Sequence, residues 1–292
     1  MIKTVSIIGA GVVGSAVGRL LRERGYEIKG VTCRSAEHAA KAVKFIGAGE
    51  PGTDTAKAAK DSDWVFITTP DRAIEKVCKE IAAGGGFSRG QLVVHMSGAL
   101  NANVLAAARK PGARAVSIHP LQSLATASQA VSNLPGSYFS VEGDPDAMAE
   151  GKEVVESLCG LMLVVPSDQK ALYHAGAAVA SNYLVTVVEF AVEIYEMLGL
   201  DRKEAINAVM PLVRGTVNNI EKVGVPDALT GPIARGDVET VEGHLEVLKK
   251  KMPGMVRLYC ELGKHAIKVG LAKGTLSQED GARLFEILSR RV

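Results

Sequence analysis

Short apolar runs alternate with amphipathic segments through the first half of the chain. Residues 5–8 form a β-branched run of strand length, and residues 15–24 follow with helical spacing. The alternation then continues, with strand-like runs at residues 27–33, 45–46, 64–70, 91–95, 113–118, 138–142 and 161–165, and helix-like segments that include 36–44, 72–83 and 145–159. Strands that alternate with helices predict an α/β fold with a doubly wound, mostly parallel sheet of the Rossmann type.

The pattern changes after Pro166, and no convincing strand follows. A long apolar segment covers residues 167–198, and Asp201 with Glu204 resembles a capping box that begins a second helix. Further helical patterns follow a loop at 224–236 and cover residues 238–251, 254–269 and 278–290. The sequence therefore predicts a Rossmann dinucleotide-binding domain at residues 1–166 and an all-helical domain at residues 167–292.

Residues 175–192 are apolar enough to resemble a membrane span. Asn182 and Glu189 interrupt this segment, and polar groups at those depths would be costly in lipid. We therefore expect a helix that protein buries and no membrane partner. Because the remaining helices of the chain are few, we expect a homodimer through the helical domain to complete the cover.

A Gly-x-Gly-x-x-Gly turn stands between the first strand and the first helix, as a dinucleotide fingerprint requires. Gly9 permits the tight turn, Gly11 lets the backbone approach a pyrophosphate, and Gly14 lets the helix pack closely on the strand. The start of the helix then directs N–H groups at the phosphates. The predicted cofactor contacts here are Gly9, Ala10, Gly11, Val12, Val13 and Gly14.

The end of the second strand indicates which dinucleotide binds. An acidic residue there would accept the ribose hydroxyls of NAD, but this chain has Arg34 and Ser35, which can receive a 2′-phosphate. The sequence thus favours NADP(H) over NAD(H). Thr68, Thr69 and Pro70 follow the fourth strand, where ligands bind in such sheets, and complete the predicted cofactor set.

Candidate chemical groups also follow strand ends. Ser97 and Gly98 come after the fifth strand and His119 after the sixth, while Lys170, His174 and Asn182 follow at helical spacing on one stripe. Hydride transfer to a carbonyl needs a proton donor at the developing alkoxide and groups that hold the substrate. The catalytic candidates are His119, Lys170, His174, Asn182 and Ser97, and the substrate candidates are Ser97, Gly98, Thr230 and Gly231. Each also has a structural interpretation, as a cap, a loop-shaping residue or a core polar group.

Composition excludes several classes of partner and site. A formal charge of +2 gives no reason to expect nucleic acid, and four scattered cysteines without a C-x-x-C pair suggest neither zinc nor a disulfide framework. The six histidines show no metal-ligand spacing, so we predict no metal. A chain that enters a strand directly and keeps reduced cysteines is expected in the cytoplasm.

Motifs throughout the chain resemble one bacterial family, the Rossmann-like proteins with a DUF2520 C-terminal domain, often labelled coenzyme F420-dependent NADP oxidoreductase-like. The motifs are the glycine fingerprint, residues 97–100, 117–122, 173–174 and 181–182, and the loop 229–237. The resemblance implies membership of the 6-phosphogluconate dehydrogenase-like superfamily, which joins a Rossmann domain to a helical domain commonly used for dimerisation. Some relatives resemble ketopantoate reductases, His119-Pro120 is similar to an element of prephenate dehydrogenases, and Ser97-Gly98 with Lys170 and Asn182 resembles the β-hydroxyacid dehydrogenases.

Three functions are consistent with these features. The first is an NADP-dependent oxidoreductase that acts on a small carboxylate, with 2-dehydropantoate as the named candidate substrate. The second is a dinucleotide-binding sensor without turnover, and the third is a reductase that depends on the deazaflavin F420.

Overall fold

The computed structural model describes residues 2–290, which divide into two compact units between Asn182 and Tyr183. The sequence placed the domain boundary at residue 166, at the start of the long helix. In the structure, the first turns of that helix belong to the sheet-containing unit. The candidate residues Lys170, His174 and Asn182 therefore lie in the same unit as the glycine turn.

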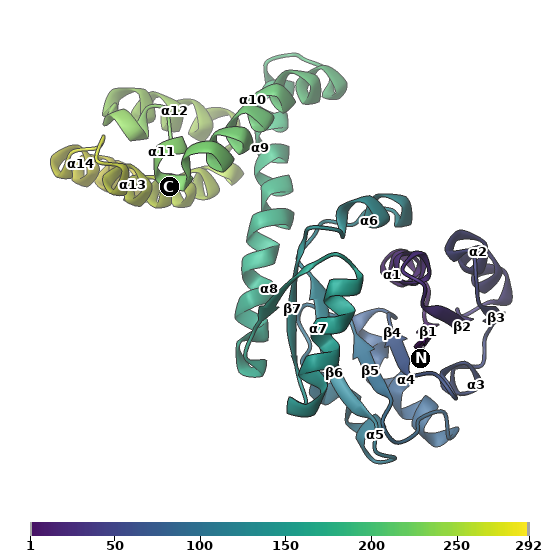
Figure 1. Ribbon diagram of the computed structural model, residues 1–292. Coiled ribbons are helices and arrows are strands. Elements are labelled where there is room, and N and C mark those ends of the chain that lie inside the picture. The colour runs from purple at the N-terminus through teal and green to yellow at the C-terminus, as the bar shows by residue number, and fades with distance from the viewer. Residues whose placement is uncertain (1, 291–292) are drawn as a thin grey trace. The chain divides into compact units, whose positions relative to one another are not determined.

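An eight-stranded sheet forms the centre of the first unit, in the order β3-β2-β1-β4-β5-β6-β7-β8 (Figure 1). Neighbouring strands are parallel except for β6 and β7, which are antiparallel. The strands are β1 (Thr4–Ile8), β2 (Glu27–Thr32), β3 (Glu50–Gly52), β4 (Trp64–Ile67), β5 (Leu92–His95), β6 (Arg114–Pro120), β7 (Tyr138–Gly143) and β8 (Leu161–Val164). The predicted α/β class with a doubly wound, mostly parallel sheet is confirmed.

Helices cover both faces of the sheet because the central strands β1, β4 and β5 are mostly apolar and are buried on both sides. One apolar core lies under α1 (Val12–Glu23), α2 (Ala36–Ile46), α6 (Ala127–Asn133) and α7 (Met148–Ser157). A second core, on the opposite face, lies under α3 (Thr55–Ala59), α4 (Asp71–Ala83), the 3-10 turn η1 (Ala102–Leu105) and α5 (Ala106–Arg109).

The third strand does not lie where the sequence predicted it. Residues 45–46 complete α2, which ends at Gly47 with a left-handed φ of 85°, and β3 follows at Glu50–Gly52. The reason is packing: the Ile46 side chain is fully buried beside Gly18 of α1. A pair of apolar residues is therefore the last turn of an amphipathic helix and not a separate strand.

The second unit is helical, as predicted, and its described part, residues 183–290, has no strand. Asp201 caps α10 in a full capping box with Glu204, and the Asp237 side chain accepts from the Thr240 N–H at 3.1 Å at the start of α12. A short helix, α11, lies within the predicted loop. The α-helices are α9 (Leu184–Met197), α10 (Arg202–Val223), α11 (Val225–Ala228), α12 (Val238–Lys251), α13 (Val256–Lys273) and α14 (Gln278–Ser289).

The long apolar helix runs from Ser167 to Met197 and contains one π-helical turn, Val179–Tyr183, between α8 (Lys170–Ala178) and α9. By length and composition it could cross a membrane, with a mean hydropathy of 1.5 over its most apolar window. We expected protein to bury it, but only 11% of that window is buried within this chain. The other helices of this chain therefore do not bury the long apolar helix as we expected.

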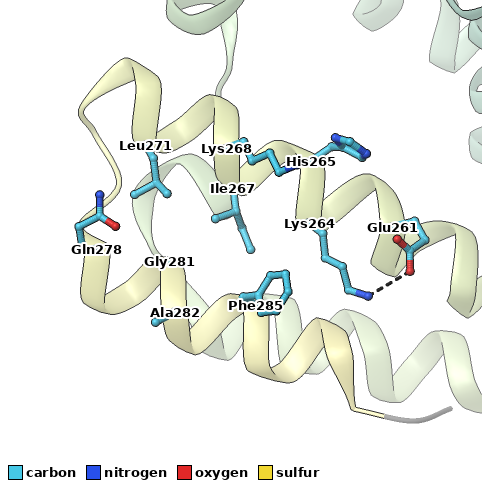
Figure 2. A pocket seen from close by; sticks show the side chains of 10 residues that line it. All are labelled: Glu261, Lys264, His265, Ile267, Lys268, Leu271, Gln278, Gly281, Ala282 and Phe285. Atoms are coloured by element: carbon cyan, nitrogen blue, oxygen red, sulfur yellow. Dashed lines mark hydrogen bonds and ion pairs between the residues drawn. The ribbon is translucent and has the colours of Figure 1, made fainter.

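A cavity of about 440 Å³ lies between α13 and α14 in the second unit (Figure 2). Apolar side chains such as Ile267 and Phe285 line it, together with the cations Lys264 and Lys268. Lys264 is paired with Glu261 at 3.0 Å. None of the site residues predicted from the sequence lines this cavity.

Close packing at Gly14 leads to a stability prediction. A Cβ atom at Gly14 would lie 2.2 Å from Thr68 Oγ1 and 3.0 Å from Ile7 Cγ2, whereas at Gly11 the nearest atom would be 4.0 Å away. Gly14→Ala is therefore expected to lower the free energy of unfolding by about 1–3 kcal/mol through overpacking. Urea denaturation measures this, with Gly11→Ala as the matched control. Equal stability of the two variants would contradict the packing role.

Candidate functional site

The glycine turn has the conformation that its sequence predicts. Gly9 has a left-handed φ of 86°, and the N–H groups of Gly9 and Ala10 both donate to the Thr32 carbonyl, at 2.9 and 3.0 Å. A Cβ at Gly9 would meet Thr69 Cγ2 at 2.5 Å, so no side chain fits between the turn and the segment after β4. The turn is thereby held against the carboxyl ends of β2 and β4.

Helix α1 begins immediately after the turn, and its first N–H groups have no side-chain cap. Gly11 is the exposed N-cap, and Val12 and Val13 are the first helical residues. Uncapped N–H groups at an open helix start, with a positive dipole end, suit a pyrophosphate. A dinucleotide bound here would supply the hydride, and these backbone groups would hold its phosphates.

Thr68, Thr69 and Pro70 connect β4 to α4 beside this turn. The Thr68 hydroxyl donates to the Gly9 carbonyl at 3.0 Å and so supports the turn from below. The buried Thr69 hydroxyl has no hydrogen-bond partner among the described residues. An unsatisfied buried hydroxyl next to the glycine turn suits a ligand that supplies the missing partner.

Arg34 and Ser35 lie at the carboxyl end of β2, next to the start of α2. Arg34 is exposed and has no ion pair with a described residue, so its guanidinium is available to an anion. The Ser35 hydroxyl caps α2, accepting from the His38 N–H at 3.3 Å, and pairs with His38 Nδ1 at 2.7 Å. His38 thus borders the position predicted for a 2′-phosphate.

Ser97 and Gly98 form the loop that follows β5. The Ser97 hydroxyl accepts from the N–H groups of Ala99 and Leu100 and donates to Asp71 Oδ2 at 2.8 Å. Since Asp71 begins α4 directly after Pro70, this bond ties the loop to the predicted cofactor segment. The hydroxyl of Ser97 therefore holds the loop in place.

His119 and His174 converge on Gly98, and Tyr173 contacts His119. The His119 and His174 rings have centroids 5.9 Å apart, and His119 Nδ1 lies 2.9 Å from the Tyr173 hydroxyl. A Cβ at Gly98 would lie 2.4 Å from the His174 ring and 2.8 Å from His119 Nε2, so only glycine leaves room for both imidazoles. Burial, followed by the nearby charges of Lys170 and His174, lowers the pKa of His119 to about 4.

Lys170 lies beneath this group and is 2% exposed. Its Nζ donates to Ser117 Oγ at 2.9 Å, to the Ser97 carbonyl at 3.3 Å and to Ser140 Oγ at 3.4 Å. Burial lowers the pKa of Lys170 to about 8, although Glu142 and Asp71 act in the opposite direction. Each of its three N–H donors therefore has an acceptor, and these acceptors belong to residues around His119.

Sequence reasoning missed three members of this polar group: Ser117, Ser140 and Glu142. In the antiparallel pair, His119 faces Ser140 and Ser117 faces Glu142, so all four side chains share one face of β6 and β7. Polar residues at every second position, in strands otherwise apolar, were the signal that could have identified them.

Asn182 lies further along the same long helix as Lys170 and His174. It is exposed and falls inside the π turn. Thr230 and Gly231 belong to the second unit, where Thr230 is exposed between α11 and the 3-10 turn at Ile233–Arg235.

In the described residues, no group of three or more His, Cys, Asp or Glu side chains could hold a metal ion. The four cysteines, all within the described part, are free thiols.

Comparison with known proteins identifies the families of the two domains. The Rossmann-like domain family matches residues 2–120, and the domain of unknown function DUF2520 matches residues 137–266. A search of the curated proteins finds no match.

Solved structures share this architecture. A protein from Thermotoga maritima is 28% identical, with a TM-score of 0.71 over 92% of this chain and 99% of that one. A candidate NADP oxidoreductase from Bacteroides fragilis is 22% identical, with a TM-score of 0.73 over 90% and 97%. The NADP-bound pyrroline carboxylate reductase of Plasmodium falciparum is 14% identical, with a TM-score of 0.59 over 99% and 98%.

The low pKa of His119 predicts a pH-dependent stability. The folded chain keeps His119 neutral down to about pH 4, whereas the unfolded chain protonates it near 6.5. Between these values the unfolded state binds more protons, so stability falls as the pH falls. His119→Asn removes this contribution, and its loss of unfolding free energy from pH 7 to pH 5 should be about 1–2 kcal/mol smaller than that of the wild type.

Urea denaturation at the two pH values measures the difference. His38→Asn, at an exposed histidine of the same unit, serves as the control and should keep the wild-type dependence. An unchanged dependence in His119→Asn would show that His119 is not held neutral in the folded state.

Proposed function

We propose that this chain, a Rossmann-like domain followed by a DUF2520 domain, is an NADP-dependent oxidoreductase that reduces the carbonyl or imine carbon of a small carboxylate. The proposal rests on one hydrogen bond, which the Ser97 hydroxyl donates to Asp71 Oδ2 at 2.8 Å. It ties the loop beneath His119 and His174 to the segment beside the glycine turn. A hydride donor and a proton donor would then meet at the carboxyl edge of one sheet.

His119 is the residue that we assign to the substrate oxygen or nitrogen. Its Nδ1 is occupied by Tyr173, and its Nε2 faces Gly98. A neutral imidazole can donate one hydrogen bond from Nε2 and so stabilise negative charge that develops on the reacting atom. His174, half-buried beside it, is placed to orient the substrate.

NADP(H) is the cofactor that the residues support. Arg34 offers an unpaired guanidinium at the end of β2, and residues 33–35, directly after that strand, include no carboxylate to select the ribose hydroxyls of NAD. The NADP named for the Plasmodium falciparum reductase is consistent with this choice in a related fold.

A substrate panel tests this function. We expect NADPH oxidation with a 2-keto acid such as 2-dehydropantoate, or with a cyclic imine carboxylate, and NADPH affinity at least about tenfold above NADH affinity. Arg34→Ala should lower the NADPH affinity by about tenfold or more and leave that for NADH unchanged. Lys41→Ala, which removes an exposed cation elsewhere on α2, is the matched control.

Two results would contradict the proposal, and each would favour one of the alternative functions. Tight NADPH binding without turnover of any carbonyl or imine compound would favour the sensor interpretation. Preferential binding of a deazaflavin would favour a reductase dependent on F420.

We also propose that the helical unit forms a homodimer through α9 and α10. Helix α10 has 22 residues, of which only Ala205 and Val209 are buried, and Leu212 is 68% exposed. A second copy is favoured over lipid because α9 carries Glu189, which pairs with Arg202 at 2.7 Å on the same surface.

Sedimentation velocity tests this interface. The wild type should be dimeric at micromolar concentration, and Leu212→Glu should produce monomer by placing a charge in an apolar contact. Val247→Glu, at a 60% exposed position on α12, should remain dimeric. A monomeric wild type, or one that sediments with lipid vesicles, would contradict the proposal.

A further inference from the structure

The Glu142 carboxylate is buried in β7 and joins two segments that border the proposed reaction site. Its Oε1 accepts from the N–H of Ala102 at 2.8 Å, and its Oε2 accepts from the hydroxyl of Ser167. Ala102 begins the 3-10 turn η1 after the β5 loop, and Ser167 begins the long helix that carries His174. We propose that Glu142 is a positioning residue, which holds His174 beside His119 through these two hydrogen bonds. The inference rests on the proposed function, in which both histidines contact the substrate.

The start of the long helix is fixed to the sheet at two points, about one turn apart. The first is the Ser167 hydroxyl on Glu142, and the second is the Lys170 ammonium, which donates to Ser117 Oγ at 2.9 Å. Two contacts fix the direction of a helix, whereas one contact allows the helix to rotate about it. His174 lies four residues beyond Lys170, about 6 Å along the helix axis. Loss of the Ser167 contact would therefore displace His174 by rotation about Lys170.

Glu142 also holds the loop that contains Gly98. A Cβ at Gly98 would contact the rings of both His119 and His174, so the position of this glycine limits the space between them. Ala102 follows Gly98 by four residues and is 2% exposed, so its bond to Glu142 fixes the end of the same loop. His119 itself belongs to β6, which pairs with β7. All three elements around the proposed substrate position thus depend on one strand, β7, and two of them depend on its carboxylate.

Filling of the protein interior does not account for a carboxylate at this position. Glu142 is 4% exposed, and the burial of a charged group costs free energy that a leucine of similar volume would not. Ser167 is exposed, so water can satisfy its hydroxyl without a protein partner. Burial lowers the pKa of Lys170 to about 8 and the Glu142 charge opposes that shift, so Glu142 also favours the ammonium that makes the second contact.

Ser167→Ala provides the first test, because it removes one hydrogen bond at an exposed residue and keeps Glu142 in place. His174 Cδ2 and His119 Cε1 both face Gly98, so NMR of the wild type should show NOEs from the Gly98 Hα protons to both rings. In Ser167→Ala the NOE to His174 should be lost. The NOE to His119 should persist, because His119 is held by the strand pair. Unchanged NOEs to both rings would overturn the proposal.

Steady-state kinetics of the same variant separate positioning from stability. In Ser167→Ala, KM for the 2-keto acid or cyclic imine that the panel identifies should rise and kcat/KM should fall about tenfold, since His174 no longer orients the substrate. The NADPH affinity should stay at the wild-type value, because other contacts hold the glycine turn. A smaller folded fraction would lower kcat alone, so a lower kcat with a wild-type KM would overturn the proposal.

Ser132→Ala is the matched control for both measurements. It removes another exposed serine hydroxyl of the first unit, one that donates to the Ser128 carbonyl within α6. This variant should keep both NOEs and the wild-type kinetic constants.

Glu142→Gln and Glu142→Leu test the carboxylate itself. Glutamine keeps an oxygen for the Ala102 N–H and offers an amide N–H to the Ser167 oxygen, so it should retain both NOEs and most of kcat/KM. Leucine has no polar atom, so the NOE from Gly98 to His174 should be lost. Retention of that NOE in Glu142→Leu would overturn the proposal, and Ser167→Ala decides the matter should Glu142→Leu not fold.

The NOE needs no substrate, so the positioning role and the proposed function can fail separately. Loss of the His174 NOE in Ser167→Ala, in a protein that reduces no carbonyl or imine, would support the positioning role and count against the proposed function. Unchanged NOEs in a protein that does reduce such a substrate would overturn the role of Glu142 and leave the proposed function in place.

Discussion

The buried Lys170 ammonium is the constraint on which the candidate site depends. A cation in a protein interior must be surrounded by acceptors, and here a backbone carbonyl and two serine hydroxyls meet that need. These acceptors come from the loop after β5 and from β6 and β7. The positions of Ser97, Ser117 and Ser140 are therefore coupled to each other through one charge, and the position of His119 follows, since it faces Ser140 across the strand pair.

The dinucleotide half of the site rests on a different kind of constraint, the exclusion of Cβ atoms. Gly9 and Gly14 are in contact with the β4 segment at Thr68 and Thr69 and leave no space for a side chain. Gly11 faces open space, as a backbone that approaches a phosphate requires. Asp71 connects the two halves because it follows this segment and accepts from Ser97. Steric exclusion thus fixes the glycine turn, and the Lys170 charge fixes the residues around His119. The proposed hydride transfer needs both groups in fixed positions.

The sequence predicted the parts of this site that depend on local geometry. The glycine turn and, in the helical unit, the capping box at Asp201 each involve a few neighbouring residues. The burial of Lys170 could not be predicted, because it depends on serines 30 to 73 residues away in the chain. The π turn at Val179–Tyr183, and the helical end of α2 at residues 45–46, likewise depend on tertiary packing that periodicity does not contain.

The low pKa of His119 and the chemistry proposed for it are compatible only if the neutral imidazole acts as the hydrogen-bond donor. An imidazolium with a pKa near 4 is scarce at neutral pH, so a mechanism that needed His119 to be charged beforehand would be slow. The neutral ring avoids this difficulty, because Nε2 can donate a hydrogen bond while Nδ1 pairs with the Tyr173 hydroxyl. Burial and, after it, the nearby Lys170 ammonium keep the imidazole neutral, so the environment that lowers the pKa of His119 also leaves it able to donate a hydrogen bond.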